Sequence, residues 1–340
     1  MVKAKVWKQV RPFDGLPERS DFELVEENLR PIEEGEFLVK AMFLSVDPCT
    51  AGPLVEENNN TTIRQTQIAR IIQSKNENFP EGKLVVVRSG WRTYSIVDGA
   101  VDPAIPEPYL LPDMGGSCPS LALGVLGVPG NIAYFTFLEL CNPKKGETVV
   151  VSGAASLVGS IVCQIAKIKE CTVIGLVETD DEGKWLINDL RIDHFINCKN
   201  EDVDKELTRI AKQGVDCYFD NVGGKVSTVV YEHMNAEGRI AKSKNTSYKS
   251  TSNDNDENEE AQKIITKKNL KLKELDVYSR TIQWMAGMFQ LQTWMAHGKI
   301  KFKESIGQGF ENTVNFFVAM SKGDSSGKAI VQLYQHLDCC

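Results

Sequence analysis

Thr148-Val-Val-Val-Ser-Gly-Ala-Ala-Ser-Leu-Val-Gly159 is the stretch of sequence that decides the fold. Its run of β-branched residues is typical of a buried strand, and the run stops at Ser152. Small residues follow, and an apolar pattern with helical spacing then continues to Ile168. A buried strand that passes directly into a helix predicts the first half of a strand–helix–strand unit in a parallel sheet.

The turn between this strand and this helix has the chemistry of an anion site. The first N–H groups of a helix have no partner within it, and the helix dipole favours negative charge beside them. The dinucleotide fingerprint is G-x-G-x-x-G. Gly153 and Gly159 are present, but Ser156 stands where the middle glycine would be. The spacing alone therefore leaves two interpretations open, a diphosphate-binding turn or a tight turn without a ligand.

Two further strand–helix pairs follow this one along the chain. Thr172–Val177 precedes a helical pattern that ends near Leu190, and Cys217–Asp220 precedes one near 226–234. This alternation predicts a doubly wound parallel sheet, which binds its ligand beyond the carboxyl ends of its strands. Asn221 follows such a strand and is a candidate to hydrogen-bond a cofactor, although asparagine also favours ordinary turns.

Other regions have a different pattern. Short apolar runs broken by turn residues, such as Phe37–Ser45 and Lys83–Arg88, predict a β-sandwich or β-barrel in the N-terminal region. The segment Ser250–Glu260 is polar and acidic, with no apolar residue. We expect it to form a solvated, mobile loop, with a lid over the site as the alternative.

Length and composition exclude several classes of function. The chain has 340 residues, which suggests two domains at roughly 150 residues per domain. A net charge of -7 argues against a nucleic-acid partner. No apolar run approaches the roughly 20 residues that span a bilayer, and Met1–Val10 has no signal-peptide core. We therefore expect a cytoplasmic protein that has no membrane or nucleic-acid partner.

The cysteines and histidines bear on redox state and metal binding. The nine cysteines include no C-x-x-C pair, which predicts reduced thiols, with Cys163 and Cys217 buried as small hydrophobes. The first of the four histidines is His194, so none lies where a zinc alcohol dehydrogenase carries its catalytic ligands. There is also no cluster of four cysteines for a structural zinc, and we expect no metal.

Short motifs along nearly the whole chain carry a resemblance to a known family. They occur, in chain order, at Ser20–Leu24, Ser45–Pro48, Gly90–Ser95, Leu123–Gly130, Ala133–Phe135, Val158–Ser160, Gln164–Lys167, Tyr218–Gly224, Gly309–Asn312 and Lys322–Lys328. Together they resemble the prostaglandin reductase family of zinc-independent medium-chain dehydrogenases and reductases, also called alkenal/one oxidoreductases.

This resemblance implies both a fold and a reaction. It implies an α/β protein with a GroES-like β-barrel catalytic domain, residues 1–125 completed by 303–340, and an inserted Rossmann domain, residues 126–302. The implied reaction is NADPH-dependent reduction of the C=C bond of an α,β-unsaturated ketone or aldehyde, as in 15-oxoprostaglandin reduction, by hydride transfer. A homodimer is implied as well, through the strand-like edge 270–278.

The resemblance also implies site residues. Tyr248 matches a tyrosine near the substrate, where its hydroxyl would donate to the developing enolate oxygen or protonate the α-carbon; the alternative is a surface tyrosine. The implied cofactor contacts are Ser156, Leu157, Val158, Gly159, Lys184, Asn221, Ser243, Ser247, Leu275, Val277, Ser325 and Lys328.

The chain departs from the family near the substrate and the cofactor. Cys49–Ala51, Gln65 and the pair Ser243-Lys244 replace family residues there. These changes motivate an alternative hypothesis, a divergent member that binds cofactor or serves as a scaffold with little catalysis.

The adenosine end of the cofactor differs too. Glu182 and Cys198 stand where the family has the lysine and tyrosine that contact the 2′-phosphate of NADPH. Glu178 lies close to where NAD enzymes place their ribose-binding acid, about 20 residues beyond the turn. Lys184 is near enough to replace the lost lysine. We predict NADP(H) as the cofactor, with NAD(H) as the alternative.

Overall fold

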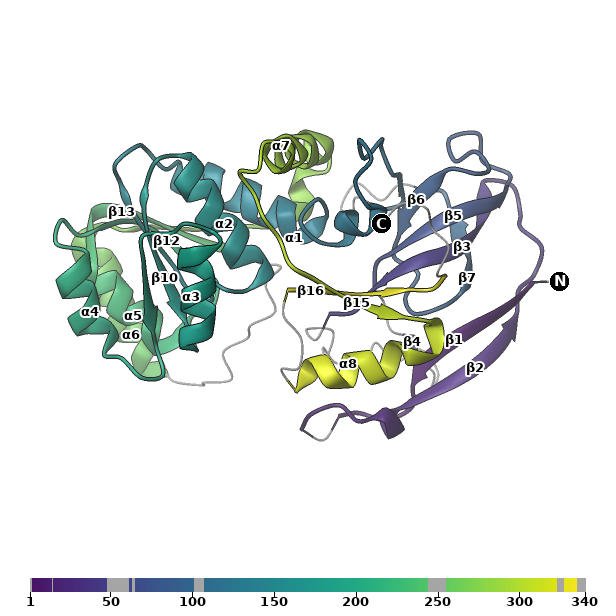
Figure 1. Ribbon diagram of the computed structural model, residues 1–340, viewed down its shortest axis with the longest axis horizontal. Helices are drawn as coiled ribbons and strands as arrows, with labels where there is room; N and C mark the ends of the chain where they lie inside the picture. The colour runs from purple at the N-terminus through teal and green to yellow at the C-terminus, as the bar shows by residue number, and fades with distance from the viewer. Residues whose placement is uncertain are drawn as a thin grey trace. The chain divides into compact units, whose positions relative to one another are not determined.

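The computed structural model of the protein describes residues 2–13, 15–47, 61–62, 65–100, 107–243, 255–322 and 327–334. The chain divides into two compact units (Figure 1). One unit consists of Met1–Gly124 together with Lys303–Cys340, and Val125–Phe302 forms the other. The second unit is therefore an insertion in the first, whose chain resumes after it.

Strands dominate the first unit. They are β1 (Lys3–Gln9), β2 (Phe22–Asn28), β3 (Glu36–Ser45), β4 (Thr61–Thr62), β5 (Gln67–Ser74), β6 (Leu84–Val87), β7 (Tyr94–Asp98), β8 (Tyr109–Leu110), β15 (Glu304–Gln308) and β16 (Lys328–Gln332). Among the described residues they form a sheet in the order β2-β1-β4 and another in the order β15-β16-β3-β5-β6-β8, with β7 also paired to β3. The predicted runs at 37–45 and 83–88 correspond to β3 and β6, and the last strands complete the N-terminal sheet through the β16–β3 pairing.

Short helices accompany the strands of the first unit, namely η1 (Arg19–Asp21), η3 (Pro119–Leu123), η6 (Phe310–Asn312) and α8 (Thr313–Ser321).

Aromatic packing explains why the C-terminal segment returns to this unit. From α8, Phe317 lies edge-on to Trp91 with ring centroids 5.3 Å apart. Trp7 donates from Nε1 to the carbonyl of Phe310 at 3.0 Å. The satisfied indole N–H thus joins residues 303 positions apart, and the buried aromatic contact strengthens the same connection.

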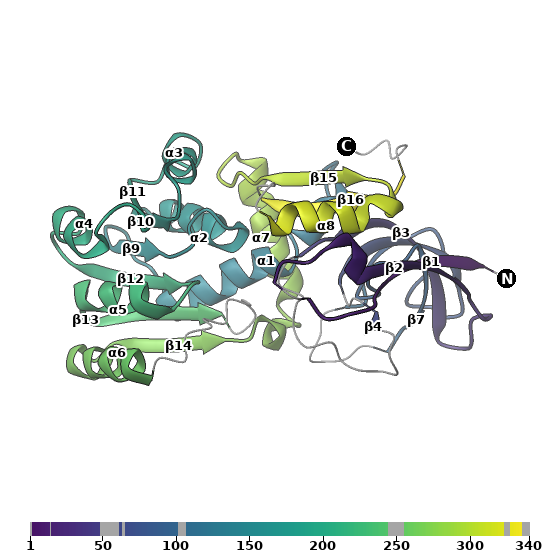
Figure 2. The ribbon, with the colours of Figure 1, turned by 90° about the horizontal axis from the view of Figure 1, so that it is seen from below.

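A single parallel sheet forms the centre of the second unit. Its strands are β9 (Thr148–Val151), β10 (Thr172–Val177), β11 (His194–Asn197), β12 (Val215–Asp220), β13 (Met234–Ser243) and β14 (Lys271–Leu275). Figure 2 shows them in the spatial order β11-β10-β9-β12-β13-β14, and every neighbouring pair is parallel. The chain moves outward from β9 to β11 and then resumes on the other side of β9, so β9 and β12 flank the topological switch point. The prediction of a doubly wound parallel sheet is confirmed.

Helices complete this unit. They are α1 (Val128–Asn131), the π-helical η4 (Ile132–Cys141), α2 (Leu157–Ile168), α3 (Asp180–Asn188), α4 (Val203–Ile210), α5 (Gly224–His233), α6 (Asn255–Lys268), η5 (Val277–Arg280) and α7 (Trp284–Ala296). Strand residues such as Ile174 and Ile240 pack with Leu207 from α4 and Val230 from α5 in one buried cluster. Burial of these apolar faces is what holds the helices on the sheet.

The prediction of a solvated loop over Ser250–Glu260 is wrong for its second half, because α6 begins at Asn255. Acidic side chains are favourable in the first turn of a helix. Behind them, Ala261, Ile264 and Ile265 recur at helical spacing and pack against the buried cluster of the sheet. The apolar face that stabilises this helix thus lies downstream of the acidic run. Residues 250–254, and with them the lid interpretation, lie outside the described residues.

The cysteines partly follow the prediction. Cys163 and Cys217 are buried, as expected. Among the described residues, the free thiols are those of Cys141, Cys163, Cys171, Cys198 and Cys217. Cys118, in contrast, is disulfide-bonded, so the prediction of uniformly reduced cysteines is wrong at this position. Disulfides depend on the spatial approach of two Cβ atoms, which the spacing of cysteines in the sequence does not reveal.

We expect Gly159→Ala to destabilise the second unit. A Cβ at this position would lie 2.3 Å from the carbonyl oxygen of Gly153, and a backbone atom cannot give way cheaply. Overpacking of this kind should lower the free energy of unfolding by about 1–3 kcal/mol, measured from urea denaturation midpoints. Gly238→Ala is the control, since a Cβ there would first meet the flexible end of Met234 at 2.7 Å, and the nearest backbone oxygen, that of Asn235, would lie at 3.0 Å. An equal loss in both variants would contradict this interpretation.

Candidate functional site

The turn after β9 is held in place by its own side chains and by β10. Gly153 has a φ of 58°, in the left-handed region that favours glycine. The N–H of Ala154 donates to the carbonyl of Leu176 in β10 at 3.0 Å. Ser156 then caps α2, and its Oγ accepts from the N–H of Gly159 at 3.1 Å. The start of α2 is thereby fixed at the carboxyl end of the central strand.

Asn221 connects this turn to the next strand. It follows β12, which pairs with β9 so that Phe219 lies opposite Val151. Its N–H donates to Ser152 Oγ at 2.9 Å, and its Nδ2 donates to Ser156 Oγ at 3.1 Å. The side chain is 9% exposed. Two predicted site features that lie 65 residues apart in the chain are therefore in direct contact.

Asp220 fixes the other side of the Asn221 turn, and sequence reasoning did not single it out. Its carboxylate is buried, and it accepts from the N–H of Gly223 at 2.8 Å and from the hydroxyl of Tyr231 at 3.1 Å. Lys242 of β13 balances its charge at 3.1 Å. Burial first, and then the charge of Asp220, raise the pKa of the Tyr231 hydroxyl, so this phenol stays neutral and donates. We assign Asp220 a structural role in shaping the turn.

A pocket of about 360 Å³ opens beyond the carboxyl ends of β10 and β11. The two strands are parallel neighbours, with Val177 opposite Asn197. The N–H of Cys198 donates to the carbonyl of Val177 at 2.9 Å. The pocket is lined by Glu178, Thr179, Asp180, Asp181, Lys184, Asn197, Lys199 and Asn200.

Two lysines line this pocket, and each is paired with an acid. Lys199 Nζ lies 2.7 Å from Glu178 Oε2, and both side chains are largely exposed. Lys184 Nζ lies 3.2 Å from Asp181 Oδ1, one helical turn away on α3. Lys184 was predicted as a site residue, whereas Lys199 was not. The position of Lys199 beside Glu178 could not be recognised without knowing that β10 and β11 are neighbours.

Two other acids of this region, Glu182 and Asp180, accept hydrogen bonds from neighbouring groups of the protein. Glu182 accepts from the N–H groups of Glu178 and Thr179, both at 3.0 Å, and completes a capping box at the start of α3. Asp180 accepts from Nδ2 of Asn197 at 2.6 Å. Glu182 therefore caps a helix at the position where the resemblance implies a phosphate-binding lysine.

Lys328 lies within the first unit, buried to 3% exposure at the start of β16. Its Nζ donates to Ser45 Oγ at 2.6 Å and forms an ion pair with Asp47. The amide of Gln65 holds the Asp47 backbone on both sides, accepting from its N–H at 3.0 Å and donating to its carbonyl at 3.1 Å. Lys328 and Gln65 thus anchor the chain where it leaves β3 toward residues 49–51, which lie outside the described residues.

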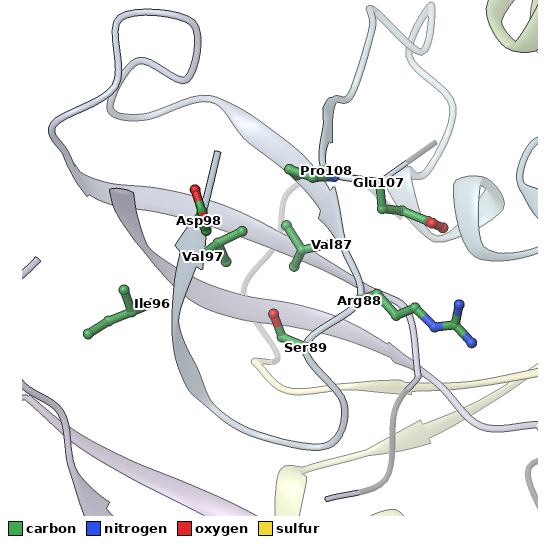
Figure 3. Close-up of a pocket in the computed structure, with 8 residues that line it drawn as sticks. All are labelled: Val87, Arg88, Ser89, Ile96, Val97, Asp98, Glu107 and Pro108. Carbon is green, nitrogen blue, oxygen red and sulfur yellow. The ribbon is translucent and has the colours of Figure 1, made fainter. Parts of the chain in front are cut away.

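Figure 3 shows a second pocket, of about 250 Å³, in the first unit. Glu107 and Arg88 extend to the same side of it, and Asp98 and Val97 line its opposite wall. Glu107 is 6% exposed, and its Oε2 has no hydrogen-bond partner within the described part of the chain. Burial raises the pKa of the Glu107 carboxyl, and the positive charge of Arg88 opposes this shift.

The other predicted cofactor residues are placed as follows. Ser243 ends β13 and pairs with Leu275, which ends β14. Val277 begins η5 and is buried, as is Leu275. The carboxyl ends of two more neighbouring strands are therefore brought together. The predicted residues that lie outside the described residues are Ser247, Tyr248 and Ser325.

The residues that the structure describes include neither a metal-binding cluster nor a membrane-spanning helix. Among the described residues, no three His, Cys, Asp or Glu side chains come close enough together to hold a metal ion. The helices described are all too short or too polar to cross a membrane. The expectation that no metal is needed stays a prediction, since part of the chain is not described.

Comparison with known proteins identifies relatives for both units. Residues 5–102 match a family described as the N-terminal domain of oxidoreductase, and residues 158–291 match one described as zinc-binding dehydrogenase. Prostaglandin reductase 1 from Bos taurus is 40% identical over 98% of this chain and 100% of its own length. The NADPH-dependent curcumin reductase of Escherichia coli is 29% identical over 94% of both chains. The crystal structure of CurA with NADPH from Vibrio vulnificus has a TM-score of 0.83 and 27% identity, covering 98% of this chain and 100% of that one.

The buried Glu107 predicts a pH-dependent contribution to stability. Because its pKa is raised in the folded protein, its favourable contribution is complete below the unfolded pKa of about 4.3 and is lost as pH rises through the folded value. Glu107→Gln, which is neutral at every pH, should therefore raise Tm at pH 7.5, and the gain should disappear near pH 4. The exposed Glu34, changed to Gln, is the control and should leave Tm unchanged. A gain that is constant across this pH range would contradict the assignment to Glu107 ionisation.

Proposed function

This chain belongs to the prostaglandin reductase family of medium-chain dehydrogenases and reductases, and from that premise we propose that it reduces the C=C bond of α,β-unsaturated ketones and aldehydes with NADPH. The observation that carries the proposal is the end-to-end similarity to prostaglandin reductase 1. The curcumin reductase and the NADPH complex of CurA support the same cofactor and the same class of reaction. A binding or scaffold protein is less favoured, because the chain retains an organised turn at the switch point of its sheet.

We assign the unit 126–302 to cofactor binding and the remainder, 1–125 with 303–340, to the substrate. The turn from Ser156 to Gly159 suits a diphosphate, since a capped helix start offers N–H donors and the positive end of a dipole. The absence of a side chain at Gly159 lets the helix approach the strand end closely. Asn221 donates to Ser156 Oγ in this turn, which supports a role for it in hydrogen-bonding the ribose or the amide of the cofactor.

The other cofactor contacts are proposed on the resemblance, with partial structural support. The adjacent strand ends at Ser243 and Leu275, with Val277 close behind, form an edge where the nicotinamide half can lie. Lys184 is proposed for the adenosine half, where it lines the pocket beyond β10. The contacts proposed on the resemblance alone are Ser247, Ser325 and Lys328.

The chemistry needs one hydride and one proton. When bound, the cofactor supplies the hydride, which goes to the β-carbon of the enone. We propose that the Tyr248 hydroxyl donates a hydrogen bond to the carbonyl oxygen as it gains negative charge, in which case the α-carbon takes its proton from water, or that Tyr248 itself delivers the proton to the α-carbon. The protein's contribution is to place the enone and to stabilise the enolate by hydrogen bonding. No metal is required for this polarisation.

A cofactor-oxidation assay tests this function. The protein should oxidise NADPH when 4-hydroxynonenal or another simple enal is added, and the product should have a saturated C=C bond with its carbonyl intact. NADPH alone should raise Tm. If neither NADPH nor NADH is oxidised or changes Tm, the reductase proposal is wrong.

Two variants separate the two halves of the proposed site. Tyr248→Phe should lower kcat by roughly 100-fold or more, because general acid catalysis typically contributes 10²–10⁴, and should leave NADPH affinity unchanged. Asn221→Ala should instead weaken NADPH binding, since it removes the hydrogen bond to Ser156. Undiminished turnover in Tyr248→Phe would remove the role proposed for this tyrosine.

We also propose a cytoplasmic homodimer. β14 is the edge strand of the parallel sheet, and among the described strands none pairs with its outer side. An unpaired edge is a ready site for a second copy related by twofold symmetry. Light scattering after size exclusion should give about twice the chain mass of 37.8 kDa. A mass equal to one chain at micromolar concentration would contradict the dimer.

A further inference from the structure

The pocket beyond β10 lies where the adenosine ribose of a bound dinucleotide would be recognised, and this inference rests on the proposed cofactor. The turn that suits the diphosphate is bonded to β10 through Ala154 and Leu176. The pocket begins two residues further on, at Glu178. In open parallel sheets the ribose next to the diphosphate lies at the end of the second strand, where an acidic residue selects the 2′-hydroxyl of NADH and a cation accommodates the 2′-phosphate of NADPH.

The charges of this pocket differ in their availability to a ligand. Asp180 is held by Asn197, and Glu182 is held by the backbone at the start of α3. Lys184 and Asp181 form a pair within α3. The pair that bridges the two strand ends is Glu178 with Lys199, at 2.7 Å.

This bridging pair contains both an acceptor for a ribose hydroxyl and a cation for a ribose phosphate. Glu178 follows β10 directly and is 65% exposed, so its carboxylate is able to accept from a ribose hydroxyl. Lys199 comes from the neighbouring β11 side and is 61% exposed, so its ammonium can turn from one anion to another without loss of buried packing. A 2′-phosphate carries about −1.5 to −2 charge and would compete with the single charge of Glu178 for this lysine.

We propose that the Glu178–Lys199 ion pair sets the choice between NADPH and NADH. Lys199 leaves Glu178 to pair with the 2′-phosphate of NADPH, while Glu178 accepts from the 2′-hydroxyl when NADH is bound. Glu178 then faces the phosphate and repels it, which reduces the preference for NADPH. The chain is accordingly a reductase that binds both cofactors, with its selectivity decided by two residues that follow adjacent strands.

Nucleotide fragments test this proposal without any catalytic step. The full-length protein is titrated by calorimetry with 2′,5′-ADP, which carries the 2′-phosphate, and with 5′-AMP, which does not. Lys199→Gln should weaken 2′,5′-ADP binding about tenfold, the value expected for one exposed charge-assisted hydrogen bond, and change 5′-AMP binding less than about twofold. Glu178→Gln should strengthen 2′,5′-ADP binding several-fold and should not strengthen 5′-AMP binding.

Lys205→Gln is the matched control. Lys205 forms a similarly exposed ion pair with Asp202 on α4 and does not line the pocket, so both affinities should stay at the wild-type value. Equal binding of 2′,5′-ADP by wild type and Lys199→Gln, or a loss confined to Lys184→Gln, would overturn the proposal and leave the cofactor intact. Binding of neither nucleotide by wild type, with no effect of NADPH on Tm, would overturn the cofactor proposal itself.

Discussion

The parallel pairing of β9 with β12 is the constraint on which the nucleotide-binding unit depends. It places Asn221 beside Ser152 and Ser156, and the two hydrogen bonds at 2.9 and 3.1 Å join the turns that follow these strands. Because β10 pairs with the opposite edge of β9, the same turn is also bonded to β10 through Ala154. The proposed diphosphate turn, the Asn221 amide and the proposed ribose pocket therefore lie along one edge of the sheet, as expected at a topological switch point.

At the proposed adenosine end, the resemblance implies a lysine where this chain has Glu182. A carboxylate pointing into a phosphate site would be unfavourable. The structure removes this conflict, because Glu182 accepts from the backbone at the start of α3, where the helix dipole also favours its charge. Lys199 supplies a cation from the neighbouring strand, and its pairing with Glu178 keeps the pocket close to balanced.

In the first unit, contacts between residues far apart in the chain hold the C-terminal segment against the N-terminal strands. Trp7 donates its indole N–H to the carbonyl of Phe310, which joins the C-terminal segment to the N-terminal strands. Trp91 donates to the carbonyl of Ser45 within the N-terminal part of the unit. Lys328 returns from the end of the chain to Ser45 and Asp47. A buried ammonium needs such partners, because an unpaired charge there would be costly. The proposed substrate unit is thus completed only when the last strand is in place.

The sequence by itself determined the doubly wound sheet, the barrel strands and the turn at Gly153–Gly159, because hydrophobic period and turn residues act over a few neighbouring positions. The family motifs added the order of the two units and the class of reaction. The sequence missed Asp220 and Lys199 and misassigned the start of α6 and the state of Cys118. Each of these depends on which strands and side chains become neighbours, and a parallel sheet brings together strand ends that lie tens of residues apart. The capping box of Glu182 with Thr179 is local, since its partners lie three and four residues upstream. Tertiary structure alone decided that Glu178 faces Lys199, because that pair depends on the adjacency of β10 and β11.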